Sequence, residues 1–287
     1  MKQDIPHIKF EPAKKDNIGF EIIPLERIHR DRHKYDHDPE QPHQLNFFKL
    51  TFYTKGEGRH FADFNWYPVK QNTLVYHTKE QINAFDFSSN LEGYCIIFTE
   101  DYFVNSFSHL PKDFVFRLFN PQLFSPVIQI PDDSEFITFF NILLQEYQLT
   151  EGFNYPTILQ SLFVILISKA ETIKQEQTFH IKDNSKIALF QKFIILLDKH
   201  FTSTRSAEDY AKQLHISYKH LNATCKELTN KTAKTIISEY IILQAKRLLI
   251  NSEIKSAELA YKIGFEDPTN FTKFFKKYTG LTPKAFK

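Results

Sequence analysis

Two segments near the C-terminus place amide, hydroxyl and amine side chains where helical spacing leaves them on an exposed face. Asparagine can pair with adenine through two hydrogen bonds, and lysine can donate to the acceptor atoms of guanine. Phosphates are bound by basic or hydroxyl side chains and by the N-terminal amides of a helix, and the predicted phosphate contacts are Tyr218, Lys226, Lys276 and Lys277. This chemistry is that of reading double-stranded DNA. The predicted base contacts, in chain order, are Lys219, Asn222, Thr269, Asn270 and Lys273.

The second segment has the local signals of a helix that follows a tight turn. Gly264 can adopt the positive φ that ends the preceding helix. Asp267 is a suitable N-cap, and Pro268 fits the first helical position, where its missing N–H costs nothing. Gly280 can end the helix. One buried face is predicted by the side chains at i, i+3, i+4 and i+7, which are Phe271, Phe274, Phe275 and Tyr278.

A second copy of this pattern lies about fifty residues upstream. His215 and Asn230 stand where the later copy has its glycines, and both residue types tolerate the left-handed region. Ser217 takes the N-cap position. Four side chains of the later copy have identical counterparts here, which are Lys226, Thr229, Thr232 and Lys234. The repeat predicts tandem helix-turn-helix units. The expected bounds are 206–229 and 256–279 for the two units and 233–250 for the helix that joins them.

The region from about Ser185 to Lys287 resembles the DNA-binding module of AraC/XylS-type transcription regulators. Three positions depart from the family, which often has arginine where this chain has Ala223, Lys273 and Lys287. Arginine reads guanine with two parallel hydrogen bonds, which lysine cannot reproduce. The most specific motifs are the Ile-Gly-Phe run at 263–265, Asn-Phe-Thr-Lys-Phe-Phe-Lys-Lys at 270–277 and Gly-Leu-Thr-Pro at 280–283.

Charge is distributed unevenly along the 287 residues. Residues 181–287 hold 19 Lys+Arg against 10 Asp+Glu, a net +9, and the other 180 hold the remaining 17 and 24, a net −7. A basic nucleic-acid module attached to a domain that does not bind nucleic acid has this distribution. Two cysteines, Cys95 and Cys225, are too few for a disulfide framework. The N-terminus lacks a signal-peptide core, and no run reaches about 18 apolar residues. We expect a cytoplasmic location without a membrane segment.

The first part of the chain reads as short strands separated by polar turns. The strand-like runs are 45–54, 59–64, 73–77 and 94–98. Many short strands predict a small β-barrel or a double-sheet jelly roll. The AraC/XylS resemblance implies that this region, about 20–130, is a cupin-like effector-sensing barrel. The expected fold class is therefore α+β with two domains, a cupin-like jelly roll followed by two helices and an all-α C-terminal domain.

Helical patterns follow the predicted barrel. Two segments within 134–174 are densely apolar, and the second is apolar around more of its circumference than one packing face needs. Its extra face packs either within the chain or against a second copy, so a homodimer through 134–174 is one expectation. The predicted division is an effector-binding and dimerisation domain at 1–175, a polar linker at 176–185 and a DNA-binding domain at 186–287. A helix of about 16 residues between the two units spans about 24 Å and would place both recognition helices in successive major-groove segments, about 34 Å apart.

Neither a metal site nor a cofactor site is predicted. His29, His33 and His37 are expected to be solvated loop residues, as is His43. A metal-holding cupin resembles a His-x-His pair followed by a carboxylate and a later histidine, which this chain lacks. An apolar effector pocket is assigned to Phe48, Phe52, Trp66 and Tyr76, with plain core packing as the alternative.

These observations predict an effector-responsive transcription regulator, with activation the expected mode, and not an enzyme. The expected partners are double-stranded DNA, an unidentified small-molecule effector and RNA polymerase. One alternative is a cupin-type metalloenzyme carrying a nucleic-acid-binding appendage. Another, a DNA-repair protein, has little support because Cys225 has no second cysteine near it.

Overall fold

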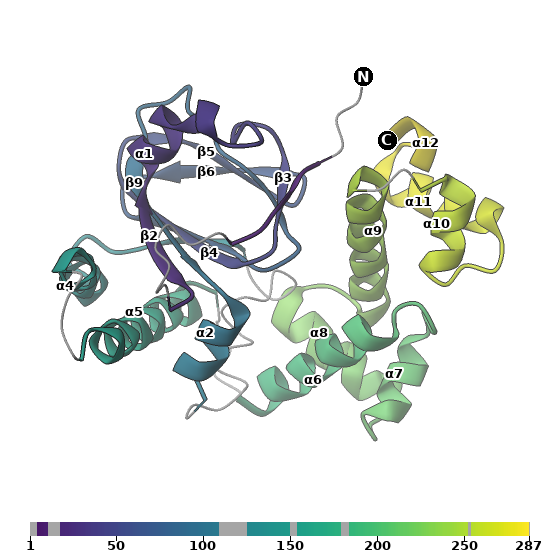
Figure 1. The fold of residues 1–287 in the computed structure, drawn as a ribbon. Coiled ribbons are helices and arrows are strands. Elements are labelled where there is room, and N and C mark those ends of the chain that lie inside the picture. Colours follow the sequence, from purple (N-terminus) through teal and green to yellow (C-terminus); the bar gives the residue numbers. More distant parts are fainter. Residues whose placement is uncertain are drawn as a thin grey trace. The chain divides into compact units, whose positions relative to one another are not determined.

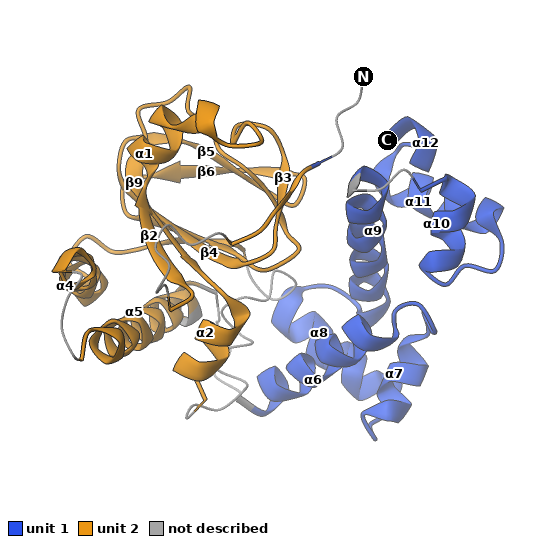
Figure 2. Cartoon of the chain, in the orientation of Figure 1, with its two compact units in different colours: residues 1–5, 181–287 blue, residues 6–180 orange. Residues whose placement is uncertain are grey.

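The computed structural model describes residues 5–10, 18–108, 125–149, 154–178, 184–251 and 254–286. The chain forms two compact units, one of Pro6–His180 and the other of Ile181–Lys287 with Met1–Ile5 (Figures 1 and 2). All the described strands lie in the unit Pro6–His180, and the described elements of the other unit are helices. The predicted two-domain α+β class is therefore confirmed.

Two five-stranded sheets are present among the described residues of the N-terminal unit. The first has the order β1 (His7–Ile8), β3 (His43–Leu45), β8 (Ile82–Ala84), β5 (Glu57–Ala62), β6 (Asn65–Lys70). The second has the order β10 (Val127–Gln129), β7 (Thr73–His77), β4 (Phe48–Lys55), β9 (Glu92–Phe98), β2 (Phe20–Pro24). The chain crosses repeatedly between the sheets, and the strand pairs are antiparallel except β1 with β3.

Strand β4 shows how the second sheet divides its side chains between two cores. Leu50 and Phe52 point to one face, in a core shared with helices α4 (Glu135–Leu149) and α5 (Tyr155–Thr178). Tyr53 points to the other face, in a core shared with residues of the first sheet. Successive strand residues alternate between faces, so Lys49 and Thr51 also lie on the inner side between the sheets.

Helices α4 (Glu135–Leu149) and α5 (Tyr155–Thr178) cover the outer face of the second sheet. The Phe163 ring of α5 lies 4.8 Å from that of Phe98, between centroids. Shorter helical elements are α1 (Leu25–Arg30), η1 (Arg32–Lys34) and α2 (Glu100–Ser106).

Helix α5 differs from expectation in two ways. It continues to Thr178, so the first three residues of the predicted 176–185 linker are helical; residues 179–183 lie outside the described ranges. Its stretch Tyr155–Lys174 is also long and apolar enough to match a membrane span by length and composition. Leu159, Phe163 and Leu166 are buried in the core beneath the sheet, but only 39% of the apolar window is buried, so packing within the unit accounts for part of that composition.

The C-terminal unit consists of seven described helices. They are α6 (Asn184–His200), α7 (Ala207–Gln213), α8 (Tyr218–Thr229), α9 (Ala233–Asn251), α10 (Ser256–Lys262), α11 (Pro268–Thr279) and α12 (Pro283–Phe286). Helix α6 packs on the first helix-turn-helix, where the Phe193 ring lies 5.6 Å from Tyr210, between centroids. Helix α9 contacts helices of both helix-turn-helix units.

Candidate nucleic-acid interface and a buried polar cluster

The two helix-turn-helix units have matching turns and caps. Ser217 accepts a hydrogen bond from the His220 backbone N–H at 3.1 Å, and Asp267 accepts one from Thr269 N–H at 2.7 Å. The turns before α8 and α11 contain His215 at φ 56° and Gly264 at φ 85°. The helices end in the left-handed region at Asn230 and Gly280. The predicted capping of both units is confirmed.

Equivalent positions of α8 and α11 form the two small cores. Leu221 and Cys225 of α8 are fully buried, as are Phe271 and Phe275, which lie fifty residues later in α11. Burial raises the pKa of the Cys225 thiol to about 12, so this cysteine is a core residue and not a nucleophile.

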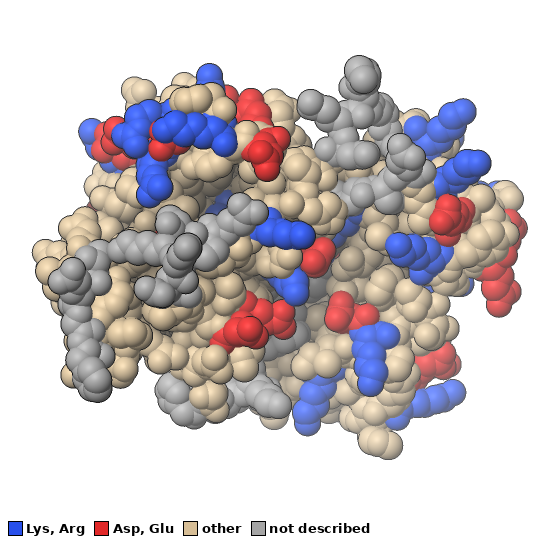
Figure 3. Space-filling model, viewed as in Figure 1, with Lys and Arg blue, Asp and Glu red and all other residues tan. Residues whose placement is uncertain are grey.

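Most of the predicted DNA-contacting side chains are exposed on these helices. The exposed members of the predicted set are Tyr218, Lys219, Lys226, Thr269, Asn270, Lys273, Lys276 and Lys277. Because they recur at helical spacing on the side away from the buried residues, each recognition helix carries one continuous polar face. In the view of Figure 3, Lys and Arg side chains of the C-terminal unit are interspersed with acidic ones.

Asn222 is placed differently from the rest of the predicted set. It is half-buried, and its Oδ1 accepts a hydrogen bond from Ala233 N–H at 3.2 Å. Pairing with adenine requires both the oxygen and the nitrogen of the amide. Because its Oδ1 is engaged by the first backbone donor of α9, this placement disfavours Asn222 as a base contact.

His220 is an exposed position that the sequence reasoning missed. It lies fifty residues before Asn270, just as Lys219 precedes Thr269 and Lys226 precedes Lys276. The sequence repeat already indicated this position. The offset of fifty residues that aligns Lys226 with Lys276 also aligns His220 with Asn270, and it aligns Asn222 with Thr272. On the first helix the equivalent of the Asn270 face is thus formed by Lys219, His220 and Ala223.

A cluster of polar side chains is buried between the two sheets, and we call it the inner polar cluster. Its centre is Asn83, whose Oδ1 accepts hydrogen bonds from Lys49 Nζ and from His60 Nε2, the latter at 2.9 Å. Asn83 Nδ2 donates to His43 Nε2 at 2.8 Å, an assignment that makes both histidines neutral. The cluster consists of His43, Lys49, Tyr53, His60, His77 and Asn83.

This cluster corrects the expectation that His43 is a solvated loop residue. His43 lies in β3 with 4% of its surface exposed, whereas His29 and His33 are exposed as expected. Burial lowers the pKa of His43 to about 3 and that of Lys49 to about 7. No group of three His, Cys, Asp or Glu side chains suited to a metal ion occurs in the described part of the chain.

Two members of the cluster have incomplete hydrogen bonding. Neither ring nitrogen of His77 makes a hydrogen bond of normal geometry, although the backbone of Phe61 lies near enough to act on its pKa. Lys49 donates to one neutral amide and lies 4.4 Å from the centre of the Phe85 ring. Buried polar groups are normally satisfied, so the unpaired His77 ring and the single hydrogen bond of the Lys49 amine need an explanation.

The predicted effector-pocket residues do not form one pocket. Phe48, Phe52 and Tyr76 belong to the core beneath helices α4 and α5. Trp66 lies in the other sheet, 42% exposed, under the Arg59 guanidinium. Strand alternation explains the error, because Phe48 and Phe52 share the outer face of β4 while Lys49, on the opposite face, points between the sheets.

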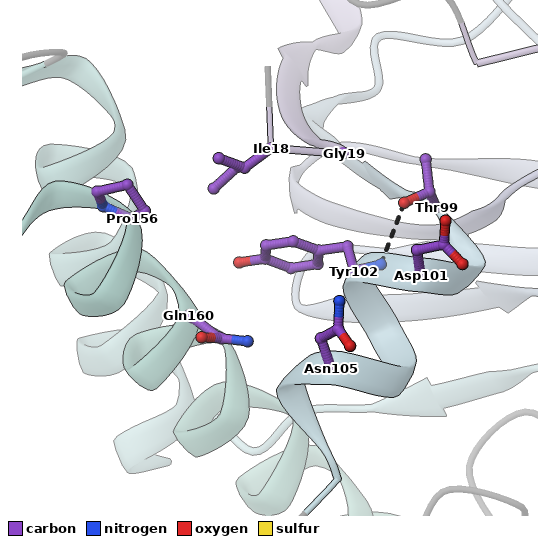
Figure 4. A pocket seen from close by; sticks show the side chains of 8 residues that line it. All are labelled: Ile18, Gly19, Thr99, Asp101, Tyr102, Asn105, Pro156 and Gln160. Atoms are coloured by element: carbon purple, nitrogen blue, oxygen red, sulfur yellow. Dashed lines mark hydrogen bonds between the residues drawn. The ribbon is translucent and has the colours of Figure 1, made fainter. Parts of the chain in front are cut away.

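An open hollow lies at the start of α2, apart from these aromatic residues (Figure 4). Its volume is about 420 Å³, and the Tyr102 ring points from α2 toward Pro156 and Gln160 of α5. The Tyr102 hydroxyl is buried without a hydrogen-bond partner. None of the four predicted pocket residues lines this hollow.

Comparison with known proteins identifies the C-terminal unit. A family model described as a helix-turn-helix domain matches residues 210–287. The C-terminal module is an AraC-type helix-turn-helix domain. An HTH-type transcriptional regulator of the cgkA 5′ region from Pseudoalteromonas carrageenovora is 30% identical over 114 residues, 40% of this chain and 66% of that protein. The Msm operon regulatory protein of Streptococcus mutans is 29% identical over 92 residues, 32% of this chain and 33% of its own length.

A longer match extends beyond the AraC-type domain. The transcriptional activator RhaS of Escherichia coli is 21% identical over 248 residues, 84% of this chain and 85% of RhaS. Among solved structures, ToxT of Vibrio cholerae bound to an unsaturated fatty acid has a TM-score of 0.46 and 15% identity, covering 94% of this chain and 95% of ToxT. The matched relatives are named as transcriptional regulators, and the chain spans 66% and 33% of the length of the first two of them. These relatives are regulators, so the metalloenzyme alternative has no support.

Proposed function

We propose that the chain is a cytoplasmic, sequence-specific activator whose N-terminal unit is a cupin-like jelly roll that binds a small-molecule effector. The single observation that carries the proposal is the pair of equivalent exposed polar faces on α8 and α11, in a chain whose other unit has a polar interior between two sheets. Activation is favoured by the long match to a relative named as an activator. RNA polymerase is the further partner that activation requires.

The proposed base contacts are Lys219 and His220 on α8 and Thr269, Asn270 and Lys273 on α11. Tyr218, Lys226, Lys276 and Lys277 are assigned to phosphates. The test is sequencing of genomic DNA bound by the purified protein, followed by binding assays on the recovered site. Recovery of fragments without a shared motif, at any salt concentration, would contradict sequence-specific recognition.

The effector site is assigned to the inner polar cluster. A ligand with acceptor atoms there would satisfy the spare donors of Lys49 and give His77 a partner, which removes the cost of burying them unpaired. Ligand binding that favours one state of the protein then alters its DNA affinity or assembly. The compounds to screen, in a promoter fusion, are those metabolised by the products of genes beside the recovered sites. Lys49→Met and His77→Ala are expected to abolish the response while DNA binding in vitro persists.

A homodimer through α4 and α5 is proposed from their outward side chains. Ile142, Leu149, Ile158 and Ile165 are exposed large apolar residues on these two helices. Burying such side chains against a second copy is favourable by about 25 cal/mol per Å² of apolar area. Sedimentation equilibrium of wild type and of Ile158→Asp tests this, and a monomeric wild type at micromolar concentration would exclude it.

A further inference from the structure

The two helix-turn-helix units touch each other directly, in addition to their connection through α9. The contact joins the loop after α6 to the turn between α10 and α11. Arg205 Nη1 donates a hydrogen bond to Gly264 O at 2.8 Å. The same guanidinium lies over the Phe265 ring, 4.0 Å from its centre. We call this contact of Thr202 and Arg205 with Gly264 and Phe265 the interlock.

Gly264 brings the two backbones close enough for the interlock to form. A Cβ atom at this position would lie 1.8 Å from Thr202 O, so any larger residue would push the α6–α7 loop away. Its φ of 85° independently favours glycine. The equivalent turn residue of the first unit, His215, also has positive φ but carries an exposed side chain. The turn conformation alone therefore does not require glycine, whereas the close approach to Thr202 does.

Both sides of the interlock are anchored in their own units. Tyr210 OH donates to Thr204 O at 3.1 Å, and Thr204 Oγ1 donates to Asp209 at 2.7 Å, which hold the loop against α7. On the other side Phe265 is buried, with its ring 5.4 Å from that of Phe271 in the core of α11. Because these side chains are held in place on both sides, a displacement of one helix-turn-helix motif is transmitted to the other through the interlock.

We propose that Arg205 is a positioning residue that fixes the second recognition helix relative to the first and so sets the spacing of the two DNA elements the protein reads. The inference rests on DNA binding by both α8 and α11. Helix α9 connects the two helix-turn-helix motifs. The interlock is a second connection between them, and it opposes rotation of one motif about α9. With two connections, α8 and α11 have one fixed distance and one fixed relative rotation about the DNA axis. Each base pair between the two DNA elements changes that distance by about 3.4 Å and that rotation by about a tenth of a turn.

The test is in vitro selection from a random DNA library with wild type, Arg205→Ala, Arg205→Lys and Gly264→Ala. Wild type is expected to select two elements at one spacing. The affinity for that site is then compared with the affinity for versions that have one base pair inserted or deleted between the elements. Wild type should bind the altered sites about tenfold more weakly, and Arg205→Ala about threefold more weakly or less. Gly264→Ala breaks the contact from the opposite side by steric clash and should relax spacing in the same way. Arg205→Lys keeps the charge but loses the planar stacking, so an intermediate value is expected.

The controls separate positioning from a phosphate contact by Arg205. Lys212→Ala removes one exposed charge from α7 without touching the interlock and should keep the spacing preference. The dependence of affinity on salt should have the same slope in wild type and Arg205→Ala, because a lost phosphate contact would reduce it by about one unit. An unchanged spacing preference in both Arg205→Ala and Gly264→Ala would overturn the inference. Selection of a single element by wild type would instead count against DNA binding by both recognition helices.

Discussion

Replacing Lys49 with methionine removes the buried amine of the inner polar cluster while keeping a side chain of similar length. Burial lowers the pKa of Lys49 from its ordinary 10.5 to about 7. The unfolded chain therefore binds more protons than the folded chain between these pH values, and the wild-type free energy of unfolding rises with pH across this window. The free-energy cost of keeping the Lys49 amine buried, which lowers the stability of the folded wild type, is fully present below pH 7 and disappears above pH 10.5. A methionine at this position has no such cost.

The shift sets the size of the effect. At about 1.4 kcal/mol per pKa unit, the wild-type penalty is about 4 kcal/mol at pH 7 and about 1 kcal/mol at pH 10. The variant loses the Lys49 hydrogen bond to Asn83, worth about 1 kcal/mol at either pH. We expect Lys49→Met to stabilise the N-terminal unit by about 3 kcal/mol at pH 7 and to be nearly neutral at pH 10.

The groups that face Lys49 leave this comparison unaffected. Burial lowers the pKa values of His43, His60 and His77, so the histidines stay neutral as the pH rises, and burial raises the pKa of the Cys95 thiol.

The assay is urea unfolding followed by tryptophan fluorescence. Trp66 is the single tryptophan and lies in β6, so the signal reports on the N-terminal unit. Lys70→Met, at an exposed position on the same strand, is the matched control and should show little change at either pH. A Lys49→Met variant destabilised equally at pH 7 and pH 10 would refute the reasoning, because the amine would then carry no burial penalty.

Asn222→Ala should destabilise the C-terminal unit by about 1 kcal/mol through loss of its hydrogen bond to α9. Asn270→Ala should leave stability unchanged and weaken specific DNA binding by about 1–3 kcal/mol. If melting and binding assays showed that Asn222→Ala weakens DNA binding and leaves stability unchanged, Asn222 would again be a base contact. Lys277→Ala should reduce the slope of log affinity against log salt by about one unit, whereas Lys192→Ala on α6 should not, and equal slopes for both would remove Lys277 from the phosphate contacts. Cys225 should resist iodoacetamide at pH 8 in the folded protein and react after denaturation, because burial raises its thiol pKa to about 12; fast native alkylation monitored by mass spectrometry would contradict its placement in the core.

The helical part of the fold was largely predictable from sequence, because its signals are local. Capping residues such as Ser217 and Asp267 act within three residues, and turn residues such as Gly264 act on their own φ. The joining helix was expected at 233–250 and is observed at Ala233–Asn251. The strand Thr73–His77 was also predicted with its observed bounds. Local backbone preferences and periodicity determine such elements before any distant contact forms.

The candidate sites depended on contacts between residues far apart in the chain. Asn222 has the residue type of a base contact, yet its partner is the backbone of Ala233 on another helix. The effector-pocket assignment failed because aromatic content does not reveal which face of a strand points between the sheets. The repeat register did hold the information needed to choose His220 over Asn222.

The sequence by itself determined the two recognition helices, their caps and their exposed basic and amide residues, since these follow from propensities acting over a few positions. Only the tertiary structure decided that Lys49 and His77 are buried together between the sheets, because β4 and β7 must pair to make them neighbours. It also decided that Arg205 meets Gly264, 59 residues later, across two helix-turn-helix units. Contacts of this kind depend on how whole helices and strands pack against one another, and a local sequence pattern does not encode that packing.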